Sequence, residues 1–414
     1  MRSTVRMLAA AAAVLLAATA SAQTVQVGTN SSITFKGFIS ATVFAQDQTF
    51  NFGNGQNAEY PVPPESTVDR WFGGGDVRNT RLTMVFDGPK VVGDWKVGAT
   101  LETDFFGGDN GNGAFSFQQP IPRLRLGFVD FTNGSTTIRI GQQWAPLFAN
   151  VASSLSHIAF PLGYGSAGDI GWRFPGLFVY QKLTPKGAAV DADAVFAVMS
   201  GSWNGPDCSA TTTPPQTNCI NSLSAGNATW PQFEARFNVG GKAGSGDWAT
   251  TWSGYVVGHI DEKDLSGAGK SAEGDRLQGS AVEIGAKFQI GPVLLQGNAY
   301  TGHSIGQQFG MITQFGKIQG TGGWGQIGFD ITKNWGIFGF WGEDNPKDSD
   351  VINSGNSRLK NVMYVGMLRY KGGPFQVGFE YLYDTLTSGS VKEGVLTTTR
   401  THGRQLALSA LYTF

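Results

Sequence analysis

Apolar and polar residues alternate with a period of two along most of the chain, and almost no stretch shows helical periodicity. The segment 94–106 shows this pattern most clearly, with one apolar face and one polar face. The apolar face carries Trp95, Val97, Ala99, Leu101, Thr103 and Phe105, and the polar face carries Lys96, Gly98, Thr100, Glu102 and Asp104. Since successive side chains of a strand point to opposite sides, the pattern predicts a β-strand with one face in an apolar environment.

Sixteen segments share this alternation. They are 33–46, 78–87, 94–105, 122–131, 136–143, 176–184, 190–200, 231–239, 248–259, 279–290, 293–302, 322–331, 335–343, 360–371, 375–385 and 403–414. An even number of strands of about ten residues is typical of transmembrane β-barrels. We therefore predict an all-β fold, a 16-stranded antiparallel transmembrane barrel.

The connections between these strands alternate between long and short. The long ones are 47–77, 106–121, 144–175, 201–230, 260–278, 303–321, 344–359 and 386–402, and the short ones are 88–93, 132–135, 185–189, 240–247, 291–292, 332–334 and 372–374. Outer-membrane barrels have long extracellular loops and short periplasmic turns. An even strand count therefore predicts that both chain ends lie in the periplasm.

Aromatic residues near the predicted strand ends support a membrane barrel over a soluble β-sandwich, which is the alternative fold. They are Trp95, Trp248, Trp335, Trp341, Tyr370, Phe375, Tyr412 and Phe414. Such residues form girdles at the two membrane interfaces. The last strand also alternates up to its final Phe414, and it resembles the terminal strand by which Gram-negative outer-membrane proteins are recognised for barrel assembly.

The first 22 residues have the features of a secretory signal peptide. Arg2 and Arg6 precede a short apolar run, and Ala20-Ser21-Ala22 forms a cleavage site. We expect residues 23–414 to form a single barrel domain in contact with outer-membrane lipid. Charged residues are only 15% of the chain, compared with roughly 25% in a typical soluble protein. The net charge of −1 gives no indication of nucleic-acid binding.

The polar faces of the early strands carry a group of arginines. Arg81, Arg123, Arg125 and Arg139 share this face with Glu102, Asp104 and Gln143. Rings of basic residues select anions in channels, so one interpretation is a basic wall at a constriction. The other is that Arg81, Arg123 and Arg125 form ion pairs with Glu102 and Asp104 across neighbouring strands.

The third long loop, 144–175, is less polar than the others, and Asp169 and Arg173 lie near its end. A loop with this apolar content is expected to be buried. We predict that it folds into the barrel and narrows the pore. Packing over the barrel rim, or against a neighbouring subunit, is the alternative.

Catalytic and metal chemistry have little support in the sequence. The four histidines His157, His259, His303 and His402 are scattered, with no Ser/His/Asp arrangement, so we predict neither an enzyme nor a bound cofactor. Cys208 and Cys219, in one external loop of an exported chain, predict a disulfide rather than a metal site. The pair Asp348 and Asp350 fits a solvated loop better than a Ca²⁺ site.

One region resembles a known family. The stretch Arg123-Leu-Arg-Leu-Gly-Phe-Val-Asp-Phe131, followed by Thr137-Ile-Arg-Ile-Gly-Gln-Gln-Trp-Ala-Pro-Leu-Phe148, is similar to the DcaP-like porins. Arg173-Phe-Pro-Gly-Leu-Phe-Val-Tyr180 resembles the return strand of that family. The resemblance implies a trimeric, 16-stranded porin that takes anionic small molecules such as dicarboxylates.

Three hypotheses follow for function. The first is a passive, homotrimeric porin for small hydrophilic, anionic solutes. The second is a substrate-specific channel with a defined site at the same place. The third is a structural or adhesive outer-membrane barrel with an occluded lumen.

Overall fold

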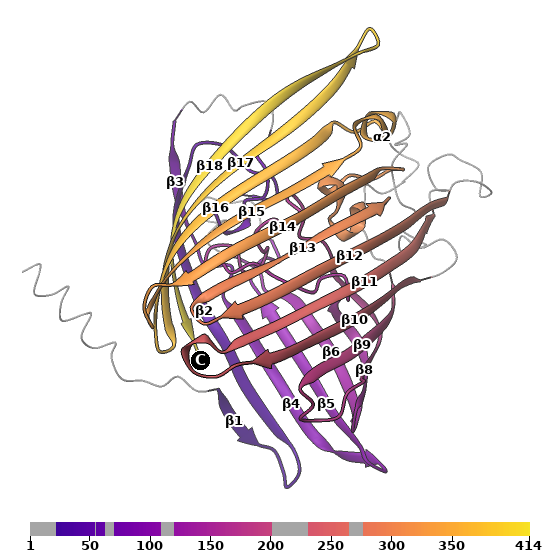
Figure 1. The fold of residues 1–414 in the computed structure, drawn as a ribbon, viewed down its shortest axis with the longest axis vertical. Helices are drawn as coiled ribbons and strands as arrows, with labels where there is room; N and C mark the ends of the chain where they lie inside the picture. The colour runs from indigo at the N-terminus through magenta and orange to yellow at the C-terminus, as the bar shows by residue number, and fades with distance from the viewer. Residues whose placement is uncertain (1–21, 54, 63–69, 109–119, 201–230, 265–275) are drawn as a thin grey trace, which may run out of the picture.

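The chain forms one closed antiparallel β-barrel (Figure 1). The computed structural model describes residues 22–53, 55–62, 70–108, 120–200, 231–264 and 276–414. Sixteen strands make the barrel wall: β2 (Ser32–Gln46), β4 (Arg81–Val92), β5 (Trp95–Asp104), β6 (Arg123–Asn133), β7 (Thr136–Trp144), β8 (Arg173–Lys182), β9 (Val190–Met199), β10 (Gln232–Ala243), β11 (Thr250–Asp264), β12 (Arg276–Ile290), β13 (Val293–His303), β14 (Gln319–Asp330), β15 (Trp335–Pro346), β16 (Arg358–Gly372), β17 (Phe375–Lys392) and β18 (Val395–Thr413). The predicted fold class is confirmed.

Each wall strand pairs with its neighbours in the sequence, and β18 closes the barrel by pairing with β2 from Gln405 opposite Gln46 to Thr413 opposite Phe38. Two short strands, β1 (Gln23–Gln26) and β3 (Phe72–Asp76), pair with opposite ends of β2. All sixteen predicted strands are present, with shifts of a few residues at their ends. The largest shifts extend the last two strands beyond the expected boundaries.

The predicted alternation of faces explains the outer surface. Large apolar side chains on the outward face are exposed, among them Val43, Ile140, Ile284, Ile327 and Leu408. A soluble protein rarely exposes so much contiguous apolar surface, whereas a lipid-embedded barrel requires it. The outward ring pair Trp335 and Tyr370, with centroids 5.1 Å apart, lies at the ends of β15 and β16, where an interfacial girdle is expected.

The two ends of the barrel differ in their connections, and we refer to them as the short-turn end and the long-loop end. At the short-turn end, Gly93, Gly134, Gly291 and Gly373 lie in turns with positive φ, which glycine adopts without steric cost. At the long-loop end, the chain forms the helix α2 (Asp348–Asn353) and the one-turn helices η1 (Gly55–Asn57), η5 (Gly306–Gln308) and η6 (Met311–Thr313). A further one-turn helix, η4 (Gly246–Trp248), lies in a connection at the short-turn end.

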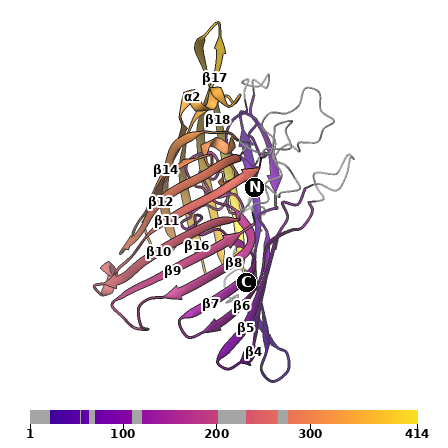
Figure 2. The same cartoon turned by 90° about the vertical axis from the view of Figure 1, so that its right-hand side faces the viewer.

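The prediction that 386–402 is a long loop is wrong. β17 and β18 continue as a ribbon and pair as far as Lys392 opposite Val395, so the hairpin projects beyond the rest of the barrel (Figure 2). Glu393 and Gly394 form the turn with φ values of 51° and 79°. Two central residues with positive φ suit a two-residue hairpin turn, because they match the twist of the flanking strands.

Candidate functional site

The segment between β7 and β8, residues 145–172, enters the barrel, as predicted, and we call it the constriction loop. Residues 161–171 are all buried, although they belong to no regular element. A loop buried in this way must find partners for its backbone polar groups inside the protein. Residues 161–171 bond largely to one another, as in Ala167 N to Gly163 O (2.7 Å), whereas the inward faces of the strands supply partners for the earlier part of the loop.

The first part of the loop, residues 147–158, follows the inner wall past one strand after another. Its contacts are Leu147 N to Glu234 Oε2 (2.7 Å, β10), Asn150 Nδ2 to Ala286 O (3.2 Å, β12), Ser153 N to Gln326 Oε1 (2.7 Å, β14), Leu155 N to Glu380 Oε1 (2.7 Å, β17) and Ile158 O to Arg81 Nη2 (3.3 Å, β4). The strands occur in their order around the barrel. The loop is therefore a belt that runs along much of the inner circumference.

Glu380 on β17 makes the densest set of contacts with the belt. Its Oε1 atom accepts hydrogen bonds from the backbone N–H groups of Leu155 and Ser156, at 2.7 and 2.8 Å. Its Oε2 atom accepts one from the Ser154 hydroxyl, at 2.7 Å. Hydrogen bonds to an ionised acceptor are stronger than neutral ones, so Glu380 fixes the middle of the belt.

The second part of the loop, residues 161–171, packs against the wall formed by β14 to β17. Leu162 and Ala167 lie in one apolar cluster with Trp324 and Phe340. Gly168 has a φ of +89°, and a Cβ atom there would lie 2.3 Å from the backbone nitrogen of Gly323. Only glycine permits this approach of loop to wall.

Two further loops fold inward and contact the constriction loop. Ser166 Oγ donates to Glu59 Oε2 (3.0 Å) in the first long loop, and His157 Nε2 donates to the carbonyl oxygen of Ala58 (3.0 Å). Gly171 N donates to Gln308 O (2.6 Å) in the loop between β13 and β14. The three loops together occupy the long-loop end of the lumen.

The loop between β13 and β14 has an unusual backbone. Five residues other than glycine have positive φ there: Ser304, Phe309, Met311, Ile312 and Thr313. Such conformations cost about 1–3 kcal/mol each and persist only where the surrounding structure fixes them. Here Asp344 accepts a hydrogen bond from Ile312 N (2.6 Å), and Tyr300 Oη accepts one from Met311 N (3.3 Å).

The predicted arginines on β4 and β6 meet the predicted carboxylates on β5. Arg125 contacts Glu102 at 2.9 Å and Asp104 at 2.6 Å, and Arg123 contacts Asp104 at 2.7 Å. Arg81 lies 3.7 Å from Glu102. Arg81, Arg123 and Arg125 therefore lie together on one wall, and they form the predicted cross-strand ion pairs with Glu102 and Asp104.

Arg173 and Arg139 have different surroundings. Arg173, the first residue of β8, lies with its guanidinium 4.3 Å from the Trp172 ring and 4.9 Å from the Trp144 ring. It is buried, and its Nε and Nη1 atoms have no hydrogen-bond partner among the described residues. Arg139 pairs instead with Asp130 at 2.7 Å, nearer the turn between β6 and β7, and it is not brought together with the other arginines.

Asp169 and Gln143 complete the predicted set. Asp169 is buried within the constriction loop, and its two carboxylate oxygens have no hydrogen-bond partner among the described residues. Burial, together with the carboxylate of Glu283, raises the pKa of Asp169 well above its ordinary value. The side-chain oxygen of Gln143, on β7, is likewise buried and without a described partner.

The wall opposite the arginines carries carboxylates. Glu234, Glu283, Glu380 and Asp384, on β10, β12 and β17, are all buried on the inward face, as the alternation predicts. The inward surface therefore has a basic sector on β4 to β8 and an acidic sector on β10 to β17. The constriction loop crosses from one sector to the other.

Sequence reasoning missed an aromatic cluster beside the basic sector. The rings of Trp144 and Phe148 stack at 4.0 Å, and Tyr164, Trp172 and Phe309 follow at 4.5 to 6.1 Å from one another or from these rings. Arginines lie over several of these rings, which stabilises the cations where water is scarce. Only the aromatic content of 144–175 and of the preceding strand end could have indicated this cluster.

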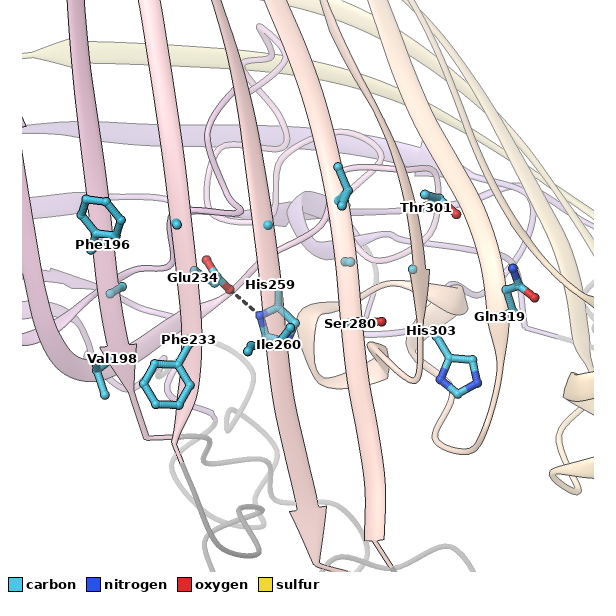
Figure 3. Close-up of a pocket in the computed structure, with 16 residues that line it drawn as sticks. Phe196, Val198, Phe233, Glu234, His259, Ile260, Ser280, Thr301, His303 and Gln319 are labelled. Carbon is cyan, nitrogen blue, oxygen red and sulfur yellow. Dashed lines mark hydrogen bonds and ion pairs between the residues drawn. The ribbon is translucent and has the colours of Figure 1, made fainter.

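A hollow of about 890 Å³ lies over strands β9 to β14 (Figure 3). Phe196, Phe233, Ile260 and Val282 line it from the outward face. Behind them, His259 Nδ1 contacts Glu234 Oε1 at 2.8 Å on the inward face. The hollow therefore lies on the outer surface of the barrel and is separated from the lumen by the barrel wall.

Other sequence predictions concern the remaining parts of the chain. Asp350 lies on α2, where its carboxylate contacts Lys347 (3.3 Å) and accepts a hydrogen bond from Gln319 N (3.2 Å). The predicted disulfide between Cys208 and Cys219, and almost all of the signal peptide, lie outside the described residues. Among the described residues, no helix is long and apolar enough to span a membrane.

Comparison with known proteins identifies the fold. No protein-family model matches the chain, and neither does any curated protein sequence. Among solved structures, the chain is similar to the outer membrane channel DcaP of Acinetobacter baumannii, with 16% identity and a TM-score of 0.67 over 94% of this chain and 99% of that one.

Two further structures show the same fold. The anion-selective porin from Comamonas acidovorans is 14% identical, with a TM-score of 0.56 over 93% of this chain and 100% of that one. OmpT, an outer-membrane protein of Vibrio cholerae, is 11% identical, with a TM-score of 0.53 over 95% and 100%. The fold is therefore that of outer-membrane porins, and the resemblance found in the sequence is confirmed at the level of fold.

Proposed function

We propose that this protein is an outer-membrane porin through which small hydrophilic, anionic solutes diffuse passively. The observation that carries the proposal is the excess of positive charge beside the constriction loop. Arg81, Arg123, Arg125 and Arg173 gather there, and among the described residues Glu102 and Asp104 are the carboxylates that form ion pairs with them. Because charges in a poorly hydrated passage act strongly, such an excess favours anions.

Arg173 makes the strongest contribution to this argument. Arg123 and Arg125 are neutralised in part by Asp104 and Glu102, whereas no described carboxylate pairs with Arg173. A buried guanidinium that lacks a carboxylate in ion-pair contact is costly, so an anion near Arg173 would replace an unfavourable interaction with a favourable one. We infer that Asp169 and Gln143 face the same passage and that Arg139 acts at its wider end.

The proposal includes the setting of the protein. Residues 1–22 would direct export and be removed, and residues 23–414 would lie in the outer membrane with the short-turn end in the periplasm. We also propose a homotrimer, since one structure of the similar OmpT of Vibrio cholerae is described as a trimer form. The proposal assigns no catalytic activity and no cofactor.

One observation favours a second candidate, a structural or adhesive barrel with an occluded lumen. Three inward loops contact one another at the long-loop end, and residues 161–171 are all buried. Single-channel recording of the refolded protein in planar bilayers separates the two candidates. Stepwise conductance, in groups of three, supports the porin, and well-folded protein without conductance would favour the occluded barrel.

A further inference from the structure

One sector of the lumen wall is apolar, which is unusual because barrel lumens are normally polar. On β16, both faces are apolar: Met363, Val365 and Met367 point inward, while Tyr364 and Leu368 point outward. The constriction loop covers only part of this sector. Met363 and Val365 belong to one apolar cluster with Leu162 and Ala167, so the loop covers the part of the apolar sector nearer the long-loop end.

Between residues 147–158 of the constriction loop and the short-turn end, the apolar surface borders a cavity of about 330 Å³. Its walls are Phe38, Met367 and Leu411 on the barrel and Leu155 and Ile158 on the belt. These residues also form one apolar cluster, to which Phe338 belongs. A volume near 300 Å³ with mostly apolar walls and a few polar groups is typical of a site for a small molecule.

Arg369 is the one arginine or lysine among the described residues that line this cavity. Arg369, on β16, contacts Asp330 only at 3.5 Å, and its Nε atom has no hydrogen-bond partner among the described residues. Its guanidinium lies 4.5 Å from the Phe338 ring, which holds it against the apolar wall. The Asp330 carboxylate is half exposed, so it neutralises Arg369 only weakly.

We propose that this cavity is a binding subsite for small amphiphilic monoanions, namely carboxylates with a short aliphatic body, on the periplasmic side of the constriction loop. The carboxylate would contact Arg369, and the aliphatic body would lie against Met367, Leu411 and Phe38. The proposal rests on the proposed function, because it specifies a solute class for the same passage. Inorganic anions and sugars cannot use the apolar walls, so they do not compete for this subsite.

The test is block of single-channel current by hexanoate added on the periplasmic side, with acetate and 1-hexanol as matched probes. Each methylene buried in an apolar site strengthens binding by about fourfold. Hexanoate should therefore half-block at a concentration at least tenfold below that of acetate, and neutral 1-hexanol should block much less. Equal block by acetate and hexanoate would refute the subsite while leaving the porin intact.

Two variants locate the block. Arg369→Gln removes the charge and Met367→Gln makes the apolar wall polar at similar length, so each should raise the half-blocking concentration of hexanoate at least fivefold. Lys287→Gln is the control, because Lys287 is an exposed inward lysine on β12 outside this cavity. Block that changes with Lys287→Gln, or that does not change with Arg369→Gln, would contradict the assignment.

A second readout covers the case in which the protein does not conduct. The ¹⁹F line of 6,6,6-trifluorohexanoate should broaden in the presence of the refolded protein and narrow again in the Arg369→Gln variant. That result supports the subsite even if the porin proposal fails. Equal broadening by both proteins means unspecific binding and refutes the subsite.

Discussion

Replacement of Glu380 by alanine should release the constriction loop from the wall of β17. In the wild-type protein, Glu380 accepts hydrogen bonds from Leu155 N and Ser156 N at 2.7 and 2.8 Å, and from Ser154 Oγ at 2.7 Å. Alanine leaves two buried N–H groups without a partner. Each such group costs about 1–3 kcal/mol, so the docked loop loses about 2–6 kcal/mol.

A loss of about 3 kcal/mol raises the population of the undocked loop roughly a hundredfold relative to the docked one. We therefore expect Glu380→Ala to show larger single-channel conductance and more open-channel noise in planar bilayers. Glu380→Gln keeps one acceptor oxygen and should fall between the two. The barrel itself should melt close to the wild-type temperature, because the contact lies between loop and wall.

The matched control is Glu343→Gln, which removes a glutamate on the outward face of β15 that pairs with Lys360 at 2.8 Å. It should leave conductance and noise unchanged. If Glu380→Ala folds and its current traces equal those of the wild type, Glu380 does not hold the loop, and the argument from these three hydrogen bonds is wrong.

Three further predictions concern other parts of the lumen. Arg173→Gln should lower the anion-to-cation permeability ratio severalfold, because Arg173 has no described carboxylate partner, whereas Arg139→Gln should change it less; reversal potentials that rank the two variants the other way would contradict this. Burial raises the pKa of Glu59, so its carboxyl destabilises the folded state fully above the folded pKa; this cost shrinks as the pH falls below that value and is gone below the unfolded pKa. Thermal melts should therefore show Glu59→Gln more stable than the wild type at pH 8, with the difference lost near pH 4; a difference that grows on acidification would show the wrong sign. Gly168→Ala should undock the loop and raise conductance, because its Cβ would meet Gly323, whereas Gly187→Ala has nearly the same φ (+88°) in open space and should conduct like the wild type.

The sequence predicts the barrel well because strand geometry is a local property. Alternation with a period of two, turn residues and terminal aromatics are all visible within about ten residues. The same alternation places Glu234, Glu283 and Glu380 on the inward face, where the structure has them. It also predicts the ion pairs of Arg123 and Arg125, since they join adjacent strands.

The path of the constriction loop could not be predicted in the same way. Its key contact joins Leu155 to Glu380, which are 225 residues apart in the sequence. The in-folding of the loop between β13 and β14 also depends on distant contacts, which hold Ile312 and its neighbours at positive φ. No local pattern encodes such contacts.

Two errors have local physical causes. The segment 386–402, predicted as a loop, is rich in threonine, which is β-branched and favours strands. The apolar sector of the lumen wall on β16 was not predicted, because only the strand face that carries polar residues was expected to point into the lumen. Met363, Val365 and Met367 violate this rule where the constriction loop, or the cavity below it, meets the wall.

The measurement that tests the central claim most directly is the reversal potential of single channels in a tenfold KCl gradient. We expect channels that open in groups of three and a reversal potential on the anion-selective side, which moves toward zero in Arg173→Gln. A cation-selective reversal potential, or the same value in wild type and Arg173→Gln, would contradict the claim that the arginine-lined wall beside the constriction loop selects the solute.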